Sequence, residues 1–116
     1  IISSLIPGTS TFRGIKDLAN KESNRIEEIK KILQNKKIKC KSSDDEMKIF
    51  GVQKINLTKN IITIPNLGDH RICMSAVIFS LLTGIKIRIK NFETVFTSSP
   101  SFLKIIKSIG GYVEIK

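Results

Sequence analysis

The chain has 116 residues, of which 41% are hydrophobic and 26% charged, a composition typical of a single globular domain. No apolar run approaches the roughly 18 residues that a membrane span needs, which argues against a membrane protein and favours a soluble one. The net charge of +10, from 20 Lys and Arg against 10 Asp and Glu, raises the local concentration of anionic ligands. A composition rich in Lys, Ile and Asn produces the same excess without any ligand.

Two cysteines, Cys40 and Cys73, lie far apart in the sequence and form no CxxC pair, so neither a zinc site nor a disulfide framework is predicted. We expect reduced thiols and a cytoplasmic location. The first residues, "IISSLIPGTS", have neither a basic n-region nor a small-residue cleavage site, which argues against a signal peptide. They also lack an initiator Met and look like the end of a helix, so we expect a piece of a longer protein.

The first half of the chain predicts an extended segment, a helix and a hairpin. The segment "TSTFRGI" (9–15) is extended, and the helix follows "KES", with Asn24 and Glu27 as a capping box. Its apolar residues recur at helical spacing and it ends near "QNKK". Two alternating stretches, "IKCK" (38–41) and "MKIFGV" (47–52), flank the polar turn "SSDDE" and predict a β-hairpin.

The second half predicts two more helices and their neighbouring strands. The stretch "DHRICMSAVIFSLLTG" (69–84) predicts a helix with Asp69 as N-cap and Gly84 as C-cap, apolar on nearly every face and therefore buried on more than one side. Extended stretches precede it (60–66) and follow it (85–91). A third helix is expected to open at Ser99 before Pro100, and "YVEIK" (112–116) is expected as a closing strand.

The alternation of helices and strands favours right-handed βαβ connections, and the hairpin favours a mixed sheet. The predicted fold class is therefore α+β (mixed α/β), with helices packed on a mixed sheet.

The stretch "LANKESNRIEEIKKIL" (18–33) places cations at a helix start, where the helix dipole favours anions. Lys21 and Arg25, together with the free N–H groups of that helix end, predict a site for phosphate or carboxylate. Glu22 lies between them and could take and return a proton in a closed site. The alternative is an ordinary surface salt-bridge cluster.

The stretch "DHRICM" repeats this arrangement, with His70 and Arg71 in the first turn of a helix that is otherwise apolar. An arginine offers a planar fork that matches a carboxylate. His70 is the only histidine, and the nearest acid, Asp69, is expected to be a cap, so no metal site is predicted. If the two helices start side by side, their cations form one pocket for a small dianion or trianion.

Three stretches in this order, "GTSTFRGIKDLANKESNRI", "DHRICM" and "TSSPSF", resemble the C-terminal part of the 5-enolpyruvylshikimate-3-phosphate synthase family. The family pattern reads roughly GxTxFxGxxELRVKESDR, DHRxAM and TSFPxF. The resemblance covers essentially the whole chain, but only about the last quarter of a typical member. It implies two similar domains of repeated βαβαββ units, of which residues 1–116 are the C-terminal part of one.

The resemblance also implies an activity and roles for residues. The family transfers the enolpyruvyl group of phosphoenolpyruvate to the 5-hydroxyl of shikimate 3-phosphate and releases phosphate, in the pathway to chorismate and the aromatic amino acids, without metal or organic cofactor. By resemblance, Lys21, Arg25 and Arg71 would bind phosphoenolpyruvate, the arginines through its carboxylate. Lys21, Glu22 and His70 would be catalytic: Glu22 in proton transfer at the methylene carbon, and His70 lining the same site.

The family's aspartate that contacts the shikimate hydroxyl, and the other domain, lie upstream of this chain. We therefore expect the isolated chain to be inactive and its partner to be the missing N-terminal remainder. The chain departs from the family pattern at Ala19, Asn24, Ser99 and Thr97, where members have Arg, Asp, an aromatic residue and, in some, a lysine that binds phosphoenolpyruvate.

Three origins are open: an excised portion of an active enzyme, the product of a split or decaying gene, or the family fold kept for another purpose. The departures at Ala19, Asn24 and Ser99 motivate the alternative of a non-catalytic remnant. Another alternative is a basic nucleic-acid-binding module that uses Lys30, Lys31, Lys36 and Lys37. The absence of Trp, with one Tyr and six scattered Phe, weighs against nucleic acid.

Overall fold

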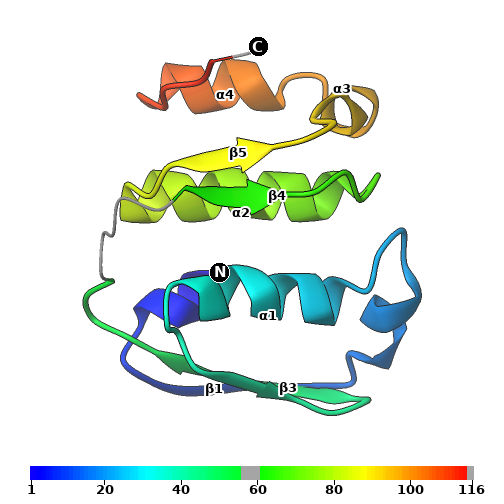
Figure 1. Ribbon diagram of the computed structural model, residues 1–116, viewed down its shortest axis with the longest axis vertical. Coiled ribbons are helices and arrows are strands. Elements are labelled where there is room, and N and C mark those ends of the chain that lie inside the picture. Colours follow the sequence, from blue (N-terminus) through cyan, green and yellow to red (C-terminus); the bar gives the residue numbers. More distant parts are fainter. Residues whose placement is uncertain (56–60, 115–116) are drawn as a thin grey trace.

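The computed structural model describes residues 1–55 and 61–114 (Figure 1). The elements along the chain are η1 (Ile2–Leu5), β1 (Gly8–Arg13), η2 (Lys16–Asn20), α1 (Arg25–Asn35), β2 (Cys40–Ser42), β3 (Glu46–Gly51), β4 (Ile62–Ile64), α2 (His70–Thr83), β5 (Ile87–Ile89), α3 (Glu93–Ser98) and α4 (Phe102–Ser108). The predicted fold class, α+β with helices on sheets, is confirmed.

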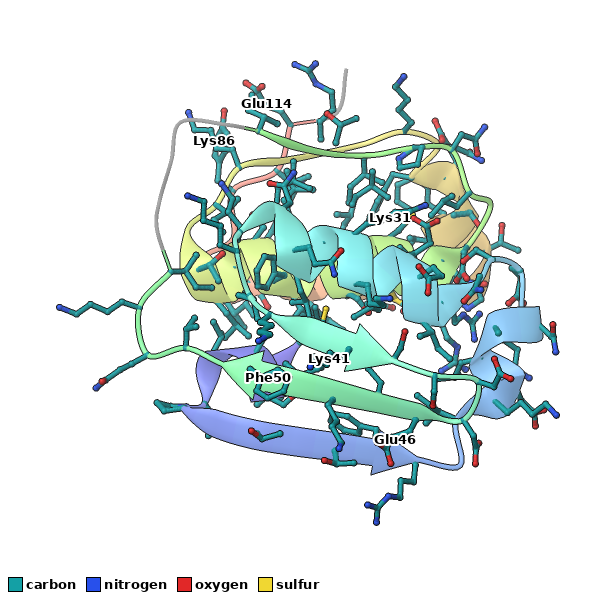
Figure 2. The ribbon with its side chains drawn as sticks, turned by 60° about the horizontal axis from the view of Figure 1, so that its bottom comes forward. Lys31, Lys41, Glu46, Phe50, Lys86 and Glu114 are labelled. Carbon is teal, nitrogen blue, oxygen red and sulfur yellow. The ribbon has the colours of Figure 1, made fainter. Side chains whose placement is uncertain are left out.

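The strands form an antiparallel sheet of order β1-β3-β2 and a separate parallel pair, β4-β5. The predicted hairpin is β2 and β3, with Cys40 opposite Ile49. In β3, Met47 and Ile49 are buried while their neighbours are half-buried, so one face of this sheet packs on the core. The other face carries Lys41, Glu46 and Phe50 (Figure 2). The parallel pair flanks α2 in sequence and makes the expected β-α-β unit.

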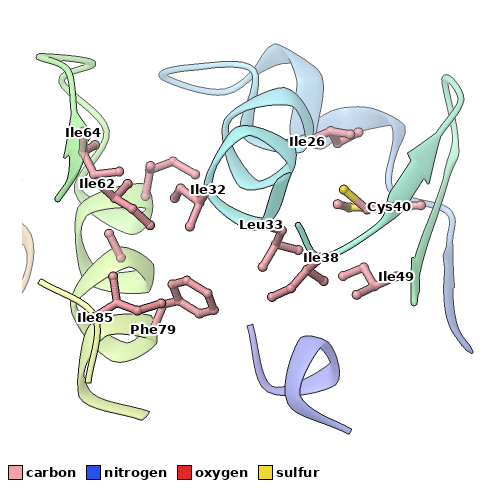
Figure 3. Packing of buried hydrophobic residues seen from close by; sticks show 13 residues of the cluster. Ile26, Ile32, Leu33, Ile38, Cys40, Ile49, Ile62, Ile64, Phe79 and Ile85 are labelled. Atoms are coloured by element: carbon pink, nitrogen blue, oxygen red, sulfur yellow. The ribbon is translucent and has the colours of Figure 1, made fainter. Parts of the chain in front are cut away.

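Helix α1 lies between the antiparallel sheet and α2 (Figures 1 and 3). It buries Ile26, Ile32 and Leu33, while α2 contacts α1, β5 and α3 and is therefore packed on more than one side, as predicted. Most of the buried hydrophobic residues form one cluster that includes Ile49 of β3 and Phe79 of α2 (Figure 3), whereas Cys73, Val95 and Ile106 lie outside it. Because one core joins both sheets, the described residues pack as a unit.

The end of the chain differs from the sequence prediction in its helices. Helix α3 was not predicted, because Thr94, Val95 and Thr97 are β-branched and favour strands. Packing decides otherwise: Val95 is fully buried, and the Phe92 and Phe96 rings meet edge-to-face at 5.7 Å.

The predicted helix start at Ser99 is wrong, because that residue ends α3 and α4 begins later. The Ser99 N–H donates to the Val95 carbonyl at 2.7 Å. Pro100 keeps the residue before it out of the helical region, and Ser99 has φ −146° and ψ 76°. Helix α4 then begins at Phe102 with Ser101 as its N-cap.

The predicted closing strand is wrong for residues 112–114, which have no strand conformation. A strand requires a neighbour to bond its backbone groups, and none of the strands in residues 1–55 and 61–114 pairs with this segment. Residues 115–116 lie outside the described residues, as does residue 60 at the start of the extended stretch 60–66.

Candidate anion-binding site at two helix starts

The two helix starts are capped at the predicted residues, but the capping box of α1 is half formed, because the Glu27 carboxylate bonds Lys30 and not the Asn24 N–H in the described part of the chain. The Asn24 side chain accepts a hydrogen bond from the Glu27 N–H at 3.2 Å and caps α1. Asp69 caps α2, because its Oδ1 accepts from the backbone N–H groups of Arg71 at 3.0 Å and Ile72 at 3.4 Å. At the other end of α2, Gly84 has φ 75°, in the left-handed region that favours glycine at a C-cap.

Asp69 also joins the start of α2 to the start of α1. Its Oδ2 accepts from Arg25 Nε at 2.9 Å and from Ser23 Oγ at 2.7 Å, and its Oδ1 accepts from Arg25 Nη2 at 3.2 Å. The two helices therefore start side by side, which was the condition for a single anion pocket.

A second carboxylate reaches Arg25 from the solvent side. The Nη2 atom of Arg25 lies 2.5 Å from Glu22 Oε2, and the Glu22 side chain is 52% exposed against 11% for Arg25. Arg25 thus lies between a buried and an exposed carboxylate. The sequence suggested that the cations at the helix starts need a negative partner. For Arg25 the chain itself supplies that partner, as Asp69 and Glu22.

Sequence reasoning identified Asp69 only as a cap and missed its pairing with Arg25. A carboxylate has about four acceptor positions, and a cap uses only some of them. The unused acceptor positions of the Asp69 carboxylate were the one signal that it has a further partner. They do not identify that partner as Arg25, which lies 44 residues away in the sequence.

Asp69 is ionised in spite of its complete burial. Burial raises the pKa of this carboxyl, but the hydrogen bonds from Arg25 and Ser23 and the Arg25 charge outweigh that effect. The net result is a pKa below the ordinary value of 3.8. Asp69 and Arg25 therefore form a buried ion pair whose charges compensate each other.

The other predicted site residues remain open to a ligand. Lys21 and Arg71 are exposed and His70 is half-buried at the first position of α2. None of these three side chains has a hydrogen bond or ion pair within the part of the chain that the structure describes. Lys21 and Arg71 thus each carry a positive charge that no described side chain compensates.

The most prominent hollow in residues 1–55 and 61–114 does not coincide with the predicted site. A shallow hollow of about 380 Å³ lies beside the start of α1, lined by residues that include Lys16, Asn24 and Lys30, but by none of the predicted site residues. In the same ranges, no group of three His, Cys, Asp or Glu side chains could hold a metal ion. No helix there is both long and apolar enough to cross a membrane.

The lysines of the nucleic-acid alternative are largely engaged. Lys30 pairs with Glu27 at 3.4 Å, and Lys31 (Figure 2) pairs with Glu28 at 2.9 Å. Lys36 is 5% exposed. Lys37 is exposed and its side chain has no hydrogen bond or ion pair in the described part of the chain, so it is the one lysine of this set left free for a phosphate backbone.

Solved structures show what kind of protein has this fold. The EPSP synthase of Acinetobacter baumannii superposes on the chain with a TM-score of 0.84 at 29% sequence identity, over 98% of this chain and 26% of that chain. The chain therefore has the fold of about a quarter of an EPSP synthase.

The chain belongs to the EPSP synthase (3-phosphoshikimate 1-carboxyvinyltransferase) family, which it matches over residues 1–106. It is 40% identical over 107 residues to the 3-phosphoshikimate 1-carboxyvinyltransferase of Campylobacter hominis, and 35% identical over 109 residues to that of Petrotoga mobilis. These matches cover 92% and 94% of this chain but 24% of each relative. The chain thus spans about a quarter of the length of the curated relatives it matches.

The family resemblance drawn from the three motifs is thereby confirmed, and the nucleic-acid alternative is not favoured. The roles of Lys21, Glu22, Arg25, His70 and Arg71 stay predictions, as does the assignment of residues 1–116 to part of one domain of a two-domain protein.

Proposed function

We propose that the chain is part of an enzyme that transfers the enolpyruvyl group of phosphoenolpyruvate to the 5-hydroxyl of shikimate 3-phosphate and releases phosphate. The observation that carries this proposal is the meeting of "KESNR" and "DHR" at Asp69, which joins Ser23 and Arg25 to the start of α2. Two stretches typical of one family, far apart in the sequence, thus lie side by side.

Phosphoenolpyruvate carries a carboxylate and a phosphate, and the proposed contacts follow from the charges available. Arg71 offers an exposed planar fork, which suits the carboxylate, and Lys21 offers an exposed point charge. Arg25 adds the edge of its guanidinium that faces Glu22 and the solvent.

The proposed chemistry has two steps and needs one proton carrier. The hydroxyl of shikimate 3-phosphate gives up its proton, which finally leaves with the phosphate as HPO4²⁻, and its oxygen bonds to the carbon that bears the phosphate. The methylene carbon gains a proton from the carrier at the same time, so that the C=C double bond becomes single. Phosphate then leaves, and the methyl carbon returns a proton to restore the double bond. Glu22 is proposed to serve at this carbon, because its exposed carboxylate is fixed by Arg25 at the same surface. His70 and Lys21 would line the reacting groups.

The proposed partner is the remainder of the parent protein, which would supply most of the shikimate 3-phosphate site. The relatives that carry the enzyme's name are about four times as long, so we expect the isolated chain to bind phosphoenolpyruvate without turning it over. The proposed location is the cytoplasm, where the buried thiols of Cys40 and Cys73 stay reduced.

The test is an amide NMR titration of the chain with phosphoenolpyruvate, repeated with inorganic phosphate and with a short RNA. We expect saturable shifts confined to residues 21–25 and 69–71, weaker with inorganic phosphate because it lacks the carboxylate. Flat spectra with phosphoenolpyruvate would support the non-catalytic remnant. Shifts only with RNA, spread over the lysines of α1, would support a nucleic-acid-binding module.

A further inference from the structure

Arg25 is held by two carboxylates, one of them buried and the other exposed to solvent. On the buried side, Nε and Nη2 donate to the two oxygens of Asp69 at 2.9 and 3.2 Å. On the solvent side, Nη2 donates to the half-exposed Glu22. A side-on contact to both carboxylate oxygens fixes the plane of a guanidinium as well as its position.

We propose that Asp69 is a positioning residue of the site: without touching the substrate, it orients the Arg25 guanidinium that meets the substrate carboxylate. This inference rests on the proposed function, which assigns Arg25 to phosphoenolpyruvate.

Capping alone does not account for an aspartate at this position. The N–H groups of Arg71 and Ile72 require one oxygen, Oδ1, and a serine or asparagine supplies such an oxygen equally well. The second oxygen, Oδ2, accepts only from Arg25 and Ser23 among the described residues. A fully buried negative charge is costly unless it is paired, so the charge of Asp69 serves its contact with Arg25.

The same contact also places Glu22. Arg25 Nη2 donates to both Asp69 Oδ1 and Glu22 Oε2. The guanidinium that positions the exposed Glu22 carboxylate is thus itself positioned by the buried Asp69. Ser23 completes the arrangement, because its hydroxyl holds the Asp69 oxygen that faces Arg25 Nε. Asp69 thereby sets the position of the proposed anion-binding group and of the proposed proton carrier together.

The test uses two variants of the chain that keep the cap and remove the charge, Asp69→Asn and Asp69→Ser. The first readout is hydrogen exchange at the Arg25 Nε–H group by NMR, and the second is the affinity for phosphoenolpyruvate. We expect exchange at least tenfold faster and binding about tenfold weaker in both variants, with the amides of α2 as protected as in the unaltered chain. Unchanged Nε–H exchange and unchanged affinity would overturn the proposal, since Asp69 would then be only a cap.

A double-mutant cycle keeps the proposal testable if the charge-free variants are unstable. Arg25→Lys retains the positive charge and loses the fork, so the effects of Arg25→Lys and Ser23→Ala on affinity should not add, because both act through the same guanidinium. Fully additive effects would overturn the proposal. If the unaltered chain fails to bind phosphoenolpyruvate, the proposed function fails, while the Nε–H exchange still decides whether Asp69 orients Arg25.

Discussion

At the residue scale, the site separates cations that are compensated from cations that are not. Arg25 is 11% exposed and bonded to Asp69 and Glu22, whereas Arg71 is exposed and has no partner among the described residues. A ligand carboxylate that binds Arg71 displaces only water. We therefore expect Arg71 to contribute more to ligand affinity than Arg25, whose charge is already compensated by Asp69 and Glu22.

Replacing Arg71 with alanine should weaken phosphoenolpyruvate binding by about 2 kcal/mol or more, roughly thirtyfold, because a charge-assisted hydrogen bond is lost. The measurement is the dissociation constant from the NMR titration, or the Michaelis constant in a complete enzyme. Lys86→Ala is the matched control (Figure 2), since it removes one exposed charge beyond the far end of α2. Equal weakening in both variants would mean that general charge, and not this site, binds the anion.

The ion pair of Asp69 predicts acid sensitivity. The pKa of Asp69 is lower in the folded chain than its ordinary value of 3.8, so the unfolded state takes up the proton first as the pH falls. Its contribution to stability is complete above the unfolded pKa and is lost as the pH falls through the folded pKa. We expect the free energy of unfolding to fall between about pH 5 and pH 2, and to fall less steeply in Asp69→Asn.

The control for this titration is Glu46→Gln, because the hydrogen bond from Arg13 also lowers the pKa of Glu46, at a half-buried position on the antiparallel sheet. If the loss of stability at low pH changes in Glu46→Gln and not in Asp69→Asn, the acid sensitivity arises from Glu46 on the antiparallel sheet and not from the ion pair of Asp69 with Arg25.

At the scale of the elements, the helix starts explain one departure from the family pattern. Asn24 stands where the family has Asp, and its side chain accepts from the Glu27 N–H as an aspartate would. Ala19 is packed against the core, and Ser99 ends α3. The departure at Asn24 therefore leaves the geometry of the α1 cap in place.

Asn24→Asp should change the free energy of unfolding by less than about 1 kcal/mol and favour the folded state, since an anion suits a helix N-terminus. Asn24→Ala should cost about 1 kcal/mol because an N–H group loses its acceptor. Urea denaturation measures both changes, with Gln34→Ala as an exposed control on the same helix. A loss of stability in Asn24→Asp would show that the departure from the family pattern compensates for something else at this start.

Local signals predicted α1, α2 and the hairpin, because periodicity and capping residues lie within each segment. They failed for α3, where the burial of Val95 overrides β-branched propensity, and for the start of α4, where Pro100 ends one helix instead of opening the next. The candidate site was half predicted. Its cations and caps are local features, whereas the contact between Arg25 and Asp69 exists only once two distant helices pack.

At the scale of the whole molecule, burial is uneven. Helices α1 and α2 bury three and four residues in or beside the core, whereas α4 buries only Ile106 and exposes Ile105 and Ile109. Helix α4 also lies at the outer end of the molecule, away from the antiparallel sheet (Figure 1). Few buried contacts mean a small free energy of local opening.

Amide hydrogen exchange should therefore proceed in a set order, with α4 exchanging first and the central turns of α1 and α2 last. The measurement is native-state exchange followed by NMR at several low concentrations of denaturant. Of the residues bonded to Asp69, Arg25, Arg71 and Ile72 lie in the first turns of α1 and α2, and Ser23 precedes α1, so we expect them to exchange before the central turns. Equal protection of α4 and α2 would contradict this order.

The contacts of Asp69 span 44 and 46 residues, so the proposed anion-binding surface forms only when the two halves of the chain have packed together. A chain in which α1 and α2 have not packed together lacks this surface. Binding of an anion at this surface therefore requires the folded chain. A ligand that binds only the folded chain increases the free energy of unfolding. At one hundred times its dissociation constant, such a ligand would add about 2.7 kcal/mol to the free energy of unfolding.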